Sequence, residues 1–340
     1  MPSPMPTRIL GASGARVSRI CLGTMMFGDQ TDEATAHRIV DHAFEHGVNF
    51  IDTADQYAKG RSEEITGRAI KANRDRWFLA TKCGNPSDSG ANDRGQSRSH
   101  VMRAAEASLK RLDTDTIDLF YVHFHDTETR WENVVETYGA LIRQGKIREW
   151  GISNVRAWHI PHICHIADRL GVARPVALQP YYNLMNRQPE VELLPAAREF
   201  GLGVVPYSPI ARGVLSGKYR LNVTPAAGTR AARADRRMME TEWRPESLEI
   251  AEKLKAHAEQ RAASLVHWAV AWVLNNSAIT SCIAGPRTFE QWTDYLAALN
   301  YAWTPEDEAL ANSLVPAGHA STPGFNDPKY PVEGRYPRIG

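Results

Sequence analysis

A (β/α)8 TIM barrel is the fold class that this 340-residue sequence predicts. Short runs rich in apolar, β-branched and aromatic residues alternate with stretches of helical spacing, and eight such pairs follow one another. No internal break marks a domain boundary, and parallel strands joined by right-handed helical crossovers close into a ring at eight. We therefore expect one α/β domain over residues 1–340, with a hairpin at 7–18, the barrel at 19–300 and a C-terminal loop and tail at 301–340.

The elements follow in an order that fits this ring. Residues 7–18 alternate around two glycines and predict a small N-terminal β-hairpin. The stretch 31–46 gathers apolar residues on one helical face, and Ser62 is the expected N-cap of the next helix. Strands are expected at 20–24, 48–52, 77–82, 117–123, 147–153, 176–179, 202–208 and 278–285. Helices are expected at 31–46, 62–72, 98–112, 131–143, 157–170, 191–200, 246–258, 263–274 and 288–299.

Three segments show neither pattern. Residues 84–96 are rich in Gly, Ser, Asn and Asp, and residues 209–244 carry many Gly, Arg and Pro residues. Both are expected to form long loops over the C-terminal face of the barrel. The tail, 316–340, is rich in Pro and Gly, so it is expected to form no helix and to cover a face of the barrel.

The composition argues against several classes of function. Charged residues make up 23% of the chain and the net charge is +1, so no broad basic field favours nucleic acid. No apolar run approaches the ~18 residues that cross a membrane, and the N-terminus lacks the apolar segment of a secretory signal. Four scattered cysteines without a C-x-x-C pair predict reduced, buried thiols in a cytoplasmic protein. The expected partner is a small molecule, and the expected state is a monomer or a weak homo-oligomer.

Four polar side chains lie at or just after the ends of three successive strands: Asp52, Tyr57, Lys82 and His123. In a barrel the carboxyl ends of all strands face one mouth, so these groups are expected to meet in one pocket. An isolated phenol titrates near ~10, and an ammonium beside it lowers that pKa. Lys82 can supply the ammonium and Asp52 the carboxylate that keeps it charged. His123 can then orient a carbonyl oxygen while Tyr57 donates a proton to it.

A hydride carrier is the natural attacking group, because none of these four side chains is suited to act as the nucleophile here. Neutral amide and hydroxyl groups at the ends of later strands suit the carboxamide of a nicotinamide, and a tyrosine offers a flat face for its ring. The residues with these properties are Ser153, Asn154, Gln179 and Tyr207.

A phosphate site is predicted at two places. Gly213 and Gly217 allow close backbone approach to a pyrophosphate, with Lys218 near. Gly285 and Arg287 open the last helix, where a helix N-terminus and a guanidinium bind phosphate well. A 2′-phosphate there indicates NADPH, with NADH as the less favoured cofactor.

Seven linked motifs resemble the aldo-keto reductase superfamily from Arg8 to Leu299. They read NFIDTADQY (49–57), ATKCG (80–84), YVHFHD (121–126), GISN (151–154), QPYYN (179–183), PYSPIARGVLSGKY (206–219) and GPRTFEQWTDYL (285–296). The resemblance implies an eight-stranded barrel closed at the bottom by a hairpin. It also implies a catalytic tetrad with tyrosine as general acid, formed by Asp52, Tyr57, Lys82 and His123. By the same resemblance, Ser153, Asn154 and Gln179 hold the carboxamide and Tyr207 stacks on the ring. The other cofactor contacts that the resemblance implies are Gly23, Thr24, Ser208, Pro209, Ile210, Arg212, Leu215, Gln291 and Asp294.

The last motif departs from its relatives, which usually read Gln, two residues, then Asn for the adenine. Here Asp294 follows Gln291, and a carboxylate can accept a hydrogen bond from the adenine amino group but cannot donate one. The preference for NADPH therefore depends on Arg287. In addition, the loop 209–244 carries arginines that could clamp phosphates as in relatives: Arg212, Arg230, Arg233, Arg236 and Arg237.

The expected substrate pocket is aromatic and apolar, which suits an aldehyde or a bulky alicyclic ketone better than a charged acid. The chain also resembles bacterial relatives that act on sugars, pyridoxal or xenobiotic ketones, including keto forms of fungal toxins, so the resemblance implies these carbonyls as candidate substrates. The residues expected to line it beside Tyr57 are Met25, Phe27, Phe124, Trp131, Tyr181 and Phe325.

Two other functions are compatible with this barrel. A metal-dependent hydrolase could use His123 and His125, but the strand ends that would complete a two-metal site carry Ser153, Gln179 and Gly285 instead. A cofactor-binding regulatory or sensor protein of the same fold, like the potassium-channel β subunits, would act mainly through partners. The complete set of four catalytic side chains favours an enzyme over both.

Overall fold

The computed structural model describes residues 5–86 and 90–332, so parts of the predicted loop 84–96 and of the tail 316–340 lie outside the described residues. The chain forms two compact units, each described by itself. Unit 1 comprises Met1–Tyr181, Pro189–Tyr207 and Leu274–Leu296, and unit 2 comprises Tyr182–Gln188, Ser208–Val273 and Ala297–Gly340. The expectation of a single domain stays a prediction.

Unit 1 is a parallel β-barrel. Its eight-stranded sheet has the order β10-β3-β4-β5-β6-β7-β8-β9, and each neighbouring pair is parallel. A parallel bridge between Val204 and Ile279 joins the two ends of this order, and Ile283 N donates to Pro206 O at 3.0 Å. The predicted (β/α)8 fold is therefore confirmed. The strands are β3 (Ile20–Gly23), β4 (Phe50–Asp52), β5 (Phe78–Cys83), β6 (Ile117–Val122), β7 (Ile147–Ser153), β8 (Ala177–Gln179), β9 (Gly203–Val204) and β10 (Cys282–Ala284).

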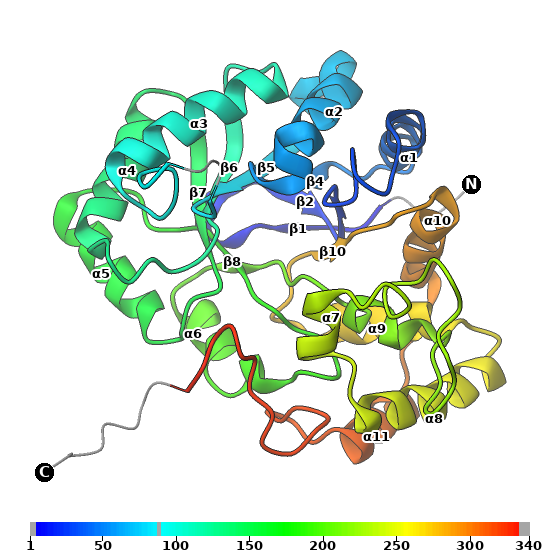
Figure 1. Cartoon of the computed structure of the whole chain (residues 1–340). Helices are drawn as coiled ribbons and strands as arrows, with labels where there is room; N and C mark the ends of the chain where they lie inside the picture. Colours follow the sequence, from blue (N-terminus) through cyan, green and yellow to red (C-terminus); the bar gives the residue numbers. More distant parts are fainter. Residues whose placement is uncertain (1–4, 87–89, 333–340) are drawn as a thin grey trace, which may run out of the picture. The chain divides into compact units, whose positions relative to one another are not determined.

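The helices of unit 1 pack outside the strands, as Figure 1 shows for α1 to α5. Each buries one apolar face; in α1 this face is Ala36, Ile39, Val40 and Ala43. These helices are α1 (Glu33–Glu45), α2 (Arg61–Ile70), α3 (Arg98–Leu112), α4 (Trp131–Arg143), α5 (His159–Leu170), α6 (Leu193–Glu199) and all but the last residue of α10 (Phe289–Ala297). Most of the predicted ranges agree to within two or three residues at each end, which is the usual uncertainty of a helix boundary.

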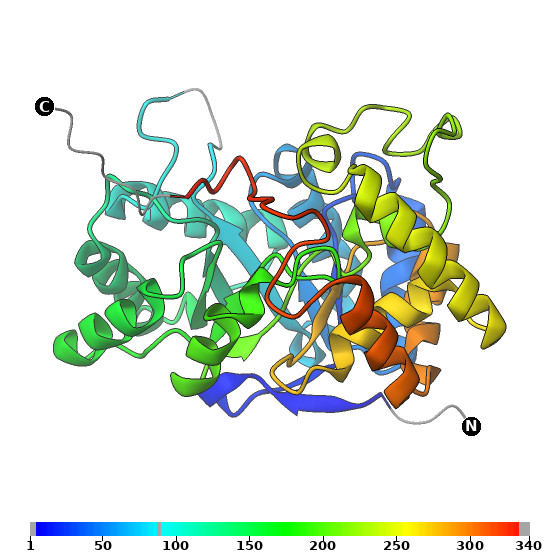
Figure 2. The same cartoon turned by 90° about the horizontal axis from the view of Figure 1, so that it is seen from below.

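The predicted hairpin pairs β1 (Thr7–Ile9) with the antiparallel strand β2 (Arg16–Ser18). It lies across one end of the barrel strands (Figure 2). Gly11 has a φ of 52°, and a Cβ there would come within 2.2 Å of Val176 O and 2.6 Å of Gly203 N. Since Val176 precedes β8 and Gly203 begins β9, the hairpin closes the amino-terminal end of the barrel and leaves the other end for chemistry.

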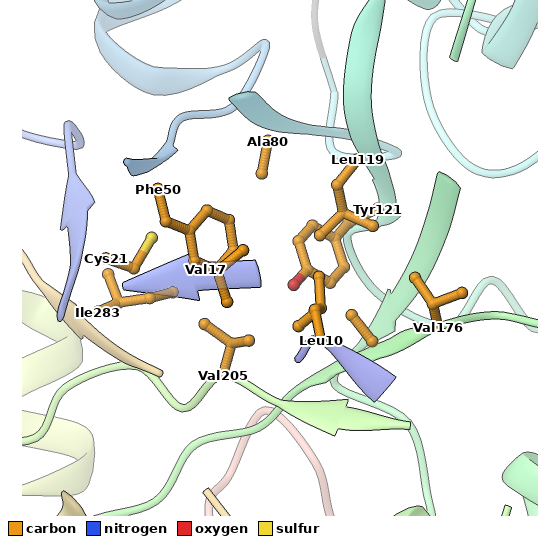
Figure 3. Packing of buried hydrophobic residues seen from close by; sticks show 11 residues of the cluster. Leu10, Val17, Cys21, Phe50, Ala80, Leu119, Tyr121, Val176, Val205 and Ile283 are labelled. Carbon is orange, nitrogen blue, oxygen red and sulfur yellow. The ribbon is translucent and has the colours of Figure 1, made fainter. Parts of the chain in front are cut away.

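The barrel interior is a packed apolar core rather than a channel (Figure 3). Leu10 and Val17 of the hairpin meet inward side chains from at least five strands, and all of them are nearly inaccessible to solvent. The residues from the strands and their flanks are Cys21, Phe50, Ala80, Leu119, Tyr121, Val176, Ala177, Val205 and Ile283. The four cysteines are free and buried, as predicted.

Two local predictions for unit 1 are wrong. Ser62 is not an N-cap: it lies inside α2, whose N-cap is Gly60, and its Oγ bonds Thr24 O at 2.8 Å instead. The predicted strand 202–208 shrinks to Gly203–Val204, because Pro206 has no N–H to continue the ladder.

Unit 2 is helical. It contains α7 (Arg236–Thr241), α8 (Pro245–Gln260), all but the last two residues of α9 (Leu265–Asn275), and α11 (Pro305–Leu314). The residues of α11 and of α7 are helical, which corrects the prediction of a C-terminal loop for the first and of a long loop for the second. Throughout the described residues of both units, no helix is both long enough and apolar enough to cross a lipid bilayer.

A buried carboxylate joins the helices of unit 2. Asp307 is fully buried and accepts from His257 Nε2 at 2.7 Å, Arg261 Nη1 at 2.6 Å and Trp268 Nε1 at 3.0 Å. Tyr301 and Thr304 add further donors. Burial alone would raise the pKa of Asp307, but these donors outweigh it and hold the pKa below its usual value.

We expect Asp307→Asn to lower the free energy of unfolding by about 3 kcal/mol, because an amide NH2 would face several buried donors. Since the Asp307 pKa is lower in the folded chain, its contribution is complete above the unfolded pKa of about 3.9 and is lost as the pH falls below it. Urea titrations at neutral pH and near pH 3 measure both effects. The exposed neighbour Glu306→Gln is the control; a loss as small as the control's would contradict the role of Asp307.

Candidate active site

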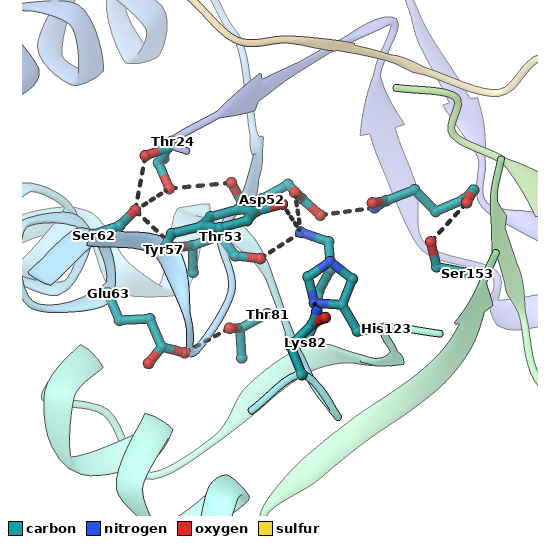
Figure 4. A network of polar contacts seen from close by, with 12 residues as sticks. Thr24, Asp52, Thr53, Tyr57, Ser62, Glu63, Thr81, Lys82, His123 and Ser153 are labelled. Atoms are coloured by element: carbon teal, nitrogen blue, oxygen red, sulfur yellow. Dashed lines mark hydrogen bonds and ion pairs between the residues drawn. The ribbon is translucent and has the colours of Figure 1, made fainter. Parts of the chain in front are cut away.

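A buried lysine and a buried aspartate meet at the ends of β4 and β5. Lys82 Nζ lies 2.5 Å from Asp52 Oδ1 and donates to Thr53 O at 2.5 Å. Its third contact is Tyr57 Oη, at 3.3 Å. The side chains of Lys82 and Asp52 are 0% and 3% exposed. The ammonium thus connects the carboxylate with the phenol, as Figure 4 shows.

Burial opposes both charges of this pair. By itself it would lower the pKa of Lys82, but Asp52 and Tyr57 outweigh it, so the Lys82 pKa lies above its usual value. Burial raises the pKa of Asp52, against the effect of Lys82 and of Gln179, whose Nε2 donates to Asp52 Oδ2 at 2.9 Å. Lys82 is therefore an ammonium at neutral pH, and its charge is held next to Tyr57.

Tyr57 lies in a sharp turn between β4 and α2. The three residues after it, Ala58, Lys59 and Gly60, have left-handed φ values of 48°, 57° and 88°. A Cβ at Gly60 would come within 2.8 Å of Arg111 Cδ, and Arg111 Nε is bonded to the buried Glu63 Oε2 at 2.6 Å. Side chains of α2 and α3 therefore hold the backbone that carries the phenol.

The pKa of Tyr57 lies above its usual value, which corrects the sequence-based expectation. Burial raises it, whereas Lys82 lowers it by less and Asp52 raises it again. The predicted lowering neglected burial and the carboxylate that neutralises Lys82. Tyr57 is consequently a neutral phenol at neutral pH, which is the form that can donate a proton.

His123 follows β6 and lies beside Tyr57. The two rings meet edge to face, with centroids 6.1 Å apart and planes at 83°. Asn85 Nδ2 lies 2.9 Å from His123 Nδ1. Because an amide nitrogen can only donate, Nδ1 accepts, and a neutral imidazole then carries its proton on Nε2. His123 can thus donate a hydrogen bond through Nε2.

The predicted nicotinamide contacts form one hydrogen-bonded chain. Ser153 Oγ donates to Gln179 O at 2.8 Å, Asn154 Nδ2 donates to Ser153 Oγ at 2.9 Å, and Tyr207 Oη donates to Asn154 Oδ1 at 2.8 Å. Asn154 has a φ of 57°, which asparagine tolerates better than most residues. Tyr207 stacks on Tyr181 with centroids 5.7 Å apart. These neutral donors and acceptors fit a carboxamide beside a flat ring.

Two predicted cofactor residues of β3 and its end have structural roles here. Gly23 lets β10 approach, since a Cβ would come within 2.6 Å of Ile283 Cγ2. Thr24 is fully buried, and its Oγ1 bonds Asp52 O at 3.2 Å and Ser62 Oγ at 2.9 Å. Ser62 Oγ also bonds Thr53 Oγ1 at 3.0 Å, so this network supports the strand end that carries Asp52.

Sequence reasoning missed two polar residues of this site. Asn85 bonds His123 but comes from a loop whose composition marked it only as polar. Asp55 is 5% exposed, and its carboxylate has no side-chain hydrogen bond among the described residues. Burial and then the nearby Glu63 raise the pKa of Asp55 to about 7. A second carboxylate three residues after Asp52 was the signal that could have singled it out.

The start of α10 carries the predicted adenine-side residues. Gly285 is exposed and Arg287 is half-buried. Gln291 Oε1 accepts from Arg287 N at 2.8 Å, so this side chain of α10 holds the turn before the helix. Thr31 Oγ1 donates to Arg287 O at 2.8 Å and connects the turn to the segment before α1. Asp294 is half-buried one turn further on.

The loop of unit 2 with the predicted pyrophosphate residues (208–218) is irregular. Ser208, Arg212 and Gly213 have φ values of 60°, 50° and 104°, and Gly217 has 73°. Arg212 Nε is buried without a partner in the described part of the chain. Of the more distant arginines, two are paired with carboxylates: Arg236 with Glu240, and Arg237 with Glu240 and Asp327. Arg233 donates to Gly228 O at 2.7 Å, and for Arg230 the phosphate contact stays a prediction.

The predicted substrate residues differ in accessibility. Met25 is 37% exposed, and Phe124 and Tyr181 are half-buried in the same unit. Phe27 is completely buried, so it has no surface to offer a substrate in this structure. In unit 2, Phe325 is half-buried and Arg244 Cζ lies 3.8 Å from the centre of its ring.

Comparison with known proteins identifies the family. The family model described as "Aldo/keto reductase family" matches residues 19–315. The chain belongs to this family. Its members are oxidoreductases that reduce carbonyl groups and generally use NAD(P)H, which agrees with the predicted activity at the level of reaction class. The four residues Asp52, Tyr57, Lys82 and His123 lie within the matched region.

Individual relatives carry names with different functions. An uncharacterized oxidoreductase of Bacillus subtilis (strain 168), YrpG, is 39% identical over 326 residues, covering 92% of this chain and 97% of that protein. A probable voltage-gated potassium channel subunit beta of Arabidopsis thaliana is 35% identical, covering 87% and 92%. Versiconal hemiacetal acetate reductase of Aspergillus parasiticus is 31% identical, covering 90% and 96%.

Membership of the aldo/keto reductase family argues against the alternative function of a metal-dependent hydrolase. Within residues 5–86 and 90–332, no group of three or more His, Cys, Asp or Glu side chains is arranged to hold a metal ion. His123 and His125 are separately engaged: the first bonds Asn85, and the second stacks on Trp131 with centroids 5.4 Å apart.

Proposed function

We propose that this protein reduces an aldehyde or ketone with a hydride from NADPH, and that Tyr57 donates the proton. The observation that carries the proposal is the buried ammonium of Lys82, held between Asp52 at 2.5 Å and Tyr57 at 3.3 Å. An ammonium beside a neutral phenol adds nothing to apolar packing, but it stabilises the phenolate that forms when the phenol gives up its proton.

The four side chains divide the reaction between them. When bound, NADPH supplies the hydride to the carbonyl carbon. Tyr57 Oη gives its proton to the carbonyl oxygen, and Lys82 stabilises the phenolate that remains. Asp52 keeps Lys82 charged, and His123 Nε2–H donates to the same oxygen and orients it. The product is an alcohol, and the reverse reaction oxidises an alcohol through the phenolate.

The nicotinamide is proposed to be held by four residues of unit 1: Ser153, Asn154, Gln179 and Tyr207. Their hydroxyl and amide groups can bond a carboxamide, and Tyr207 presents a ring face beside them. The pyrophosphate contacts in 208–218 stay predictions that are tested by substitution of Lys218.

NADPH rather than NADH is proposed because Arg287 lies at the start of α10, where a 2′-phosphate would be favoured. We expect Arg287→Ala to weaken NADPH binding about ten-fold and NADH binding about two-fold or less. Fluorescence titration of both nucleotides measures this. Arg38→Ala is the control. Arg38 belongs to α1, and its guanidinium lies 3.7 Å from the centre of the ring of Phe289, the first residue of α10. Equal losses for the two nucleotides would contradict phosphate recognition.

The substrate class is proposed from the same surroundings. Met25, Phe124 and Tyr181 offer apolar and aromatic surface in the unit that carries the tetrad. One relative is named versiconal hemiacetal acetate reductase, which supports reduction as the activity. We propose aldehydes and bulky ketones, including xenobiotic and toxin-derived carbonyls, as substrates.

A panel of aldehydes and ketones, assayed by the loss of NADPH absorbance, tests the proposal. Turnover of at least one carbonyl, with many cycles per protein molecule, is the expected result. The channel-subunit relatives suggest the alternative of a regulatory protein that binds the nucleotide. Tight binding of NADPH without turnover of any carbonyl would favour that alternative.

A further inference from the structure

A cluster of aromatic side chains beside the tetrad contains two buried N–H groups without an acceptor. Trp131 begins α4 and His159 begins α5; they are 6% and 1% exposed, and their rings lie 5.6 Å apart. Neither Trp131 Nε1 nor His159 Nε2 has a hydrogen-bond partner within the described ranges of the chain. A buried donor left unpaired destabilises the fold, so two in one cluster require a reason.

The protonation of His159 follows from its contacts. Its Nδ1 accepts from Arg156 N at 3.0 Å, so the proton of the neutral ring is on Nε2. Burial, followed by the nearby His125, lowers the pKa of His159 to about 4. At neutral pH the cluster therefore presents two neutral donors, the indole N–H of Trp131 and the imidazole N–H of His159.

The surroundings favour an electron-rich oxygen. The N-cap residues of α4 and α5, Arg130 and Trp158, make no side-chain hydrogen bond to their helices. The positive ends of both helix dipoles thus lie at this cluster. His125 stacks on Trp131 with planes at 7° and lies 4.3 Å from His159, so flat rings border the two donors.

The cluster is tied to the catalytic strand end. His125 is two residues after His123, so their Cα atoms are at most about 7.6 Å apart. Asp126 fixes this loop: its carboxylate accepts from Gln96 N at 2.7 Å, Glu128 N at 2.9 Å and Thr129 Oγ1 at 2.7 Å. His125 therefore links the strand end that carries His123 to the ring of Trp131.

We propose that Trp131 and His159 form a substrate subsite that binds an oxygen acceptor remote from the reacting carbonyl. The preferred substrate then has a flat body with a carboxylate, carbonyl or similar oxygen at its far end. This inference rests on the proposed function for the identity of the ligand as substrate. It adds to the apolar pocket predicted from sequence a polar end that selects among carbonyl compounds.

The test compares two aldehydes of similar length, 4-carboxybenzaldehyde and 4-ethylbenzaldehyde, in the intact chain and in Trp131→Phe. We expect the intact chain to bind the carboxylate-bearing aldehyde more tightly. The preference is expressed as the ratio of the two Kd or KM values. In the variant this ratio should fall about ten-fold, because one hydrogen bond to a charged group is lost. Comparing ratios removes the difference in intrinsic reactivity between the aldehydes.

Thermal stability without ligand supplies the second measurement. Trp131→Phe removes a donor that has no protein acceptor, so its Tm should fall less than that of Trp150→Phe. Trp150 is the matched control, because it is fully buried and its Nε1 donates to Ala173 O at 2.7 Å. A loss of Tm as large as the control's would mean that the Trp131 donor is satisfied by structural water, and would overturn the proposal.

An unchanged ratio of the two aldehydes in the variant would also overturn it, leaving a packing role for the cluster. Calorimetric binding of 4-carboxybenzaldehyde with NADPH present needs no turnover. If the chain reduces neither aldehyde, the proposed function is in question. The subsite is still tested by calorimetry, because the intact chain should bind the carboxylate-bearing aldehyde and Trp131→Phe should lose that binding.

Discussion

Tyr57→Phe is expected to lower kcat for carbonyl reduction by at least about 10²-fold while NADPH binding stays near normal, since general acid catalysis is worth that much. The substitution removes one hydroxyl from a ring whose position is set by the turn and by α2. Lys82 Nζ loses its 3.3 Å contact but keeps Asp52 and Thr53 O, so the fold around it persists.

Steady-state kinetics and NADPH titration of the same preparation measure this. Tyr138→Phe is the matched control: Tyr138 is fully buried, and its hydroxyl bonds Gln96 Oε1 at 3.4 Å, outside the proposed site. The raised pKa of Tyr57 adds a pH prediction. Reduction should not decline through Tyr57 below about pH 10, whereas alcohol oxidation should rise with pH as phenolate forms. Turnover by the Tyr57 variant at the rate of the intact chain would refute the assignment.

Lys82→Met is expected to lower kcat at least as much, about 10²-fold or more, because the phenolate loses its neighbouring cation and the Tyr57 pKa rises further. The same change leaves Asp52 as an unpaired buried carboxylate, with an expected loss of about 3–5 kcal/mol in the free energy of unfolding. Activity assays and urea unfolding of one variant therefore report both consequences.

Adding Asp52→Asn to Lys82→Met separates the two effects. The double variant should regain stability, because the unpaired charge is gone, but it should not regain activity. The exposed Lys71→Met, which removes an ion pair with Asp113 at the surface, is the control. Recovery of activity together with stability would show that Lys82 supports the fold only.

Several parts of the fold were accessible from local pattern. The strand 147–153 and the helices 98–112 and 131–143 agree with the structure at both ends, because each has a strong period and clear boundaries. The helix α11 and the short α7 were missed, since both lie in segments whose prolines, glycines and charges read as loop. Ser62 shows the limit of capping rules: its hydroxyl bonds Thr53 and also Thr24, which lies 38 residues before it, and no local signal indicates these contacts.

The candidate site divides in the same way. The identity of Asp52, Tyr57, Lys82 and His123 could be read from residue types at strand ends, because parallel strands in a barrel bring their carboxyl ends together. The direction of the Tyr57 pKa shift could not be predicted from residue types. It depends on whether burial outweighs the effect of the Lys82 ammonium, which is itself paired with Asp52.

The sequence by itself determined the barrel, the reaction class and the four groups proposed for the chemistry, since period and residue type are local properties. Only the tertiary structure decided that Tyr57 stays a neutral phenol, that Asn85 sets the tautomer of His123, and that Trp131 and His159 share a cluster with unpaired donors. The physical reason is that burial and hydrogen-bond satisfaction depend on residues that meet only when the strands have closed.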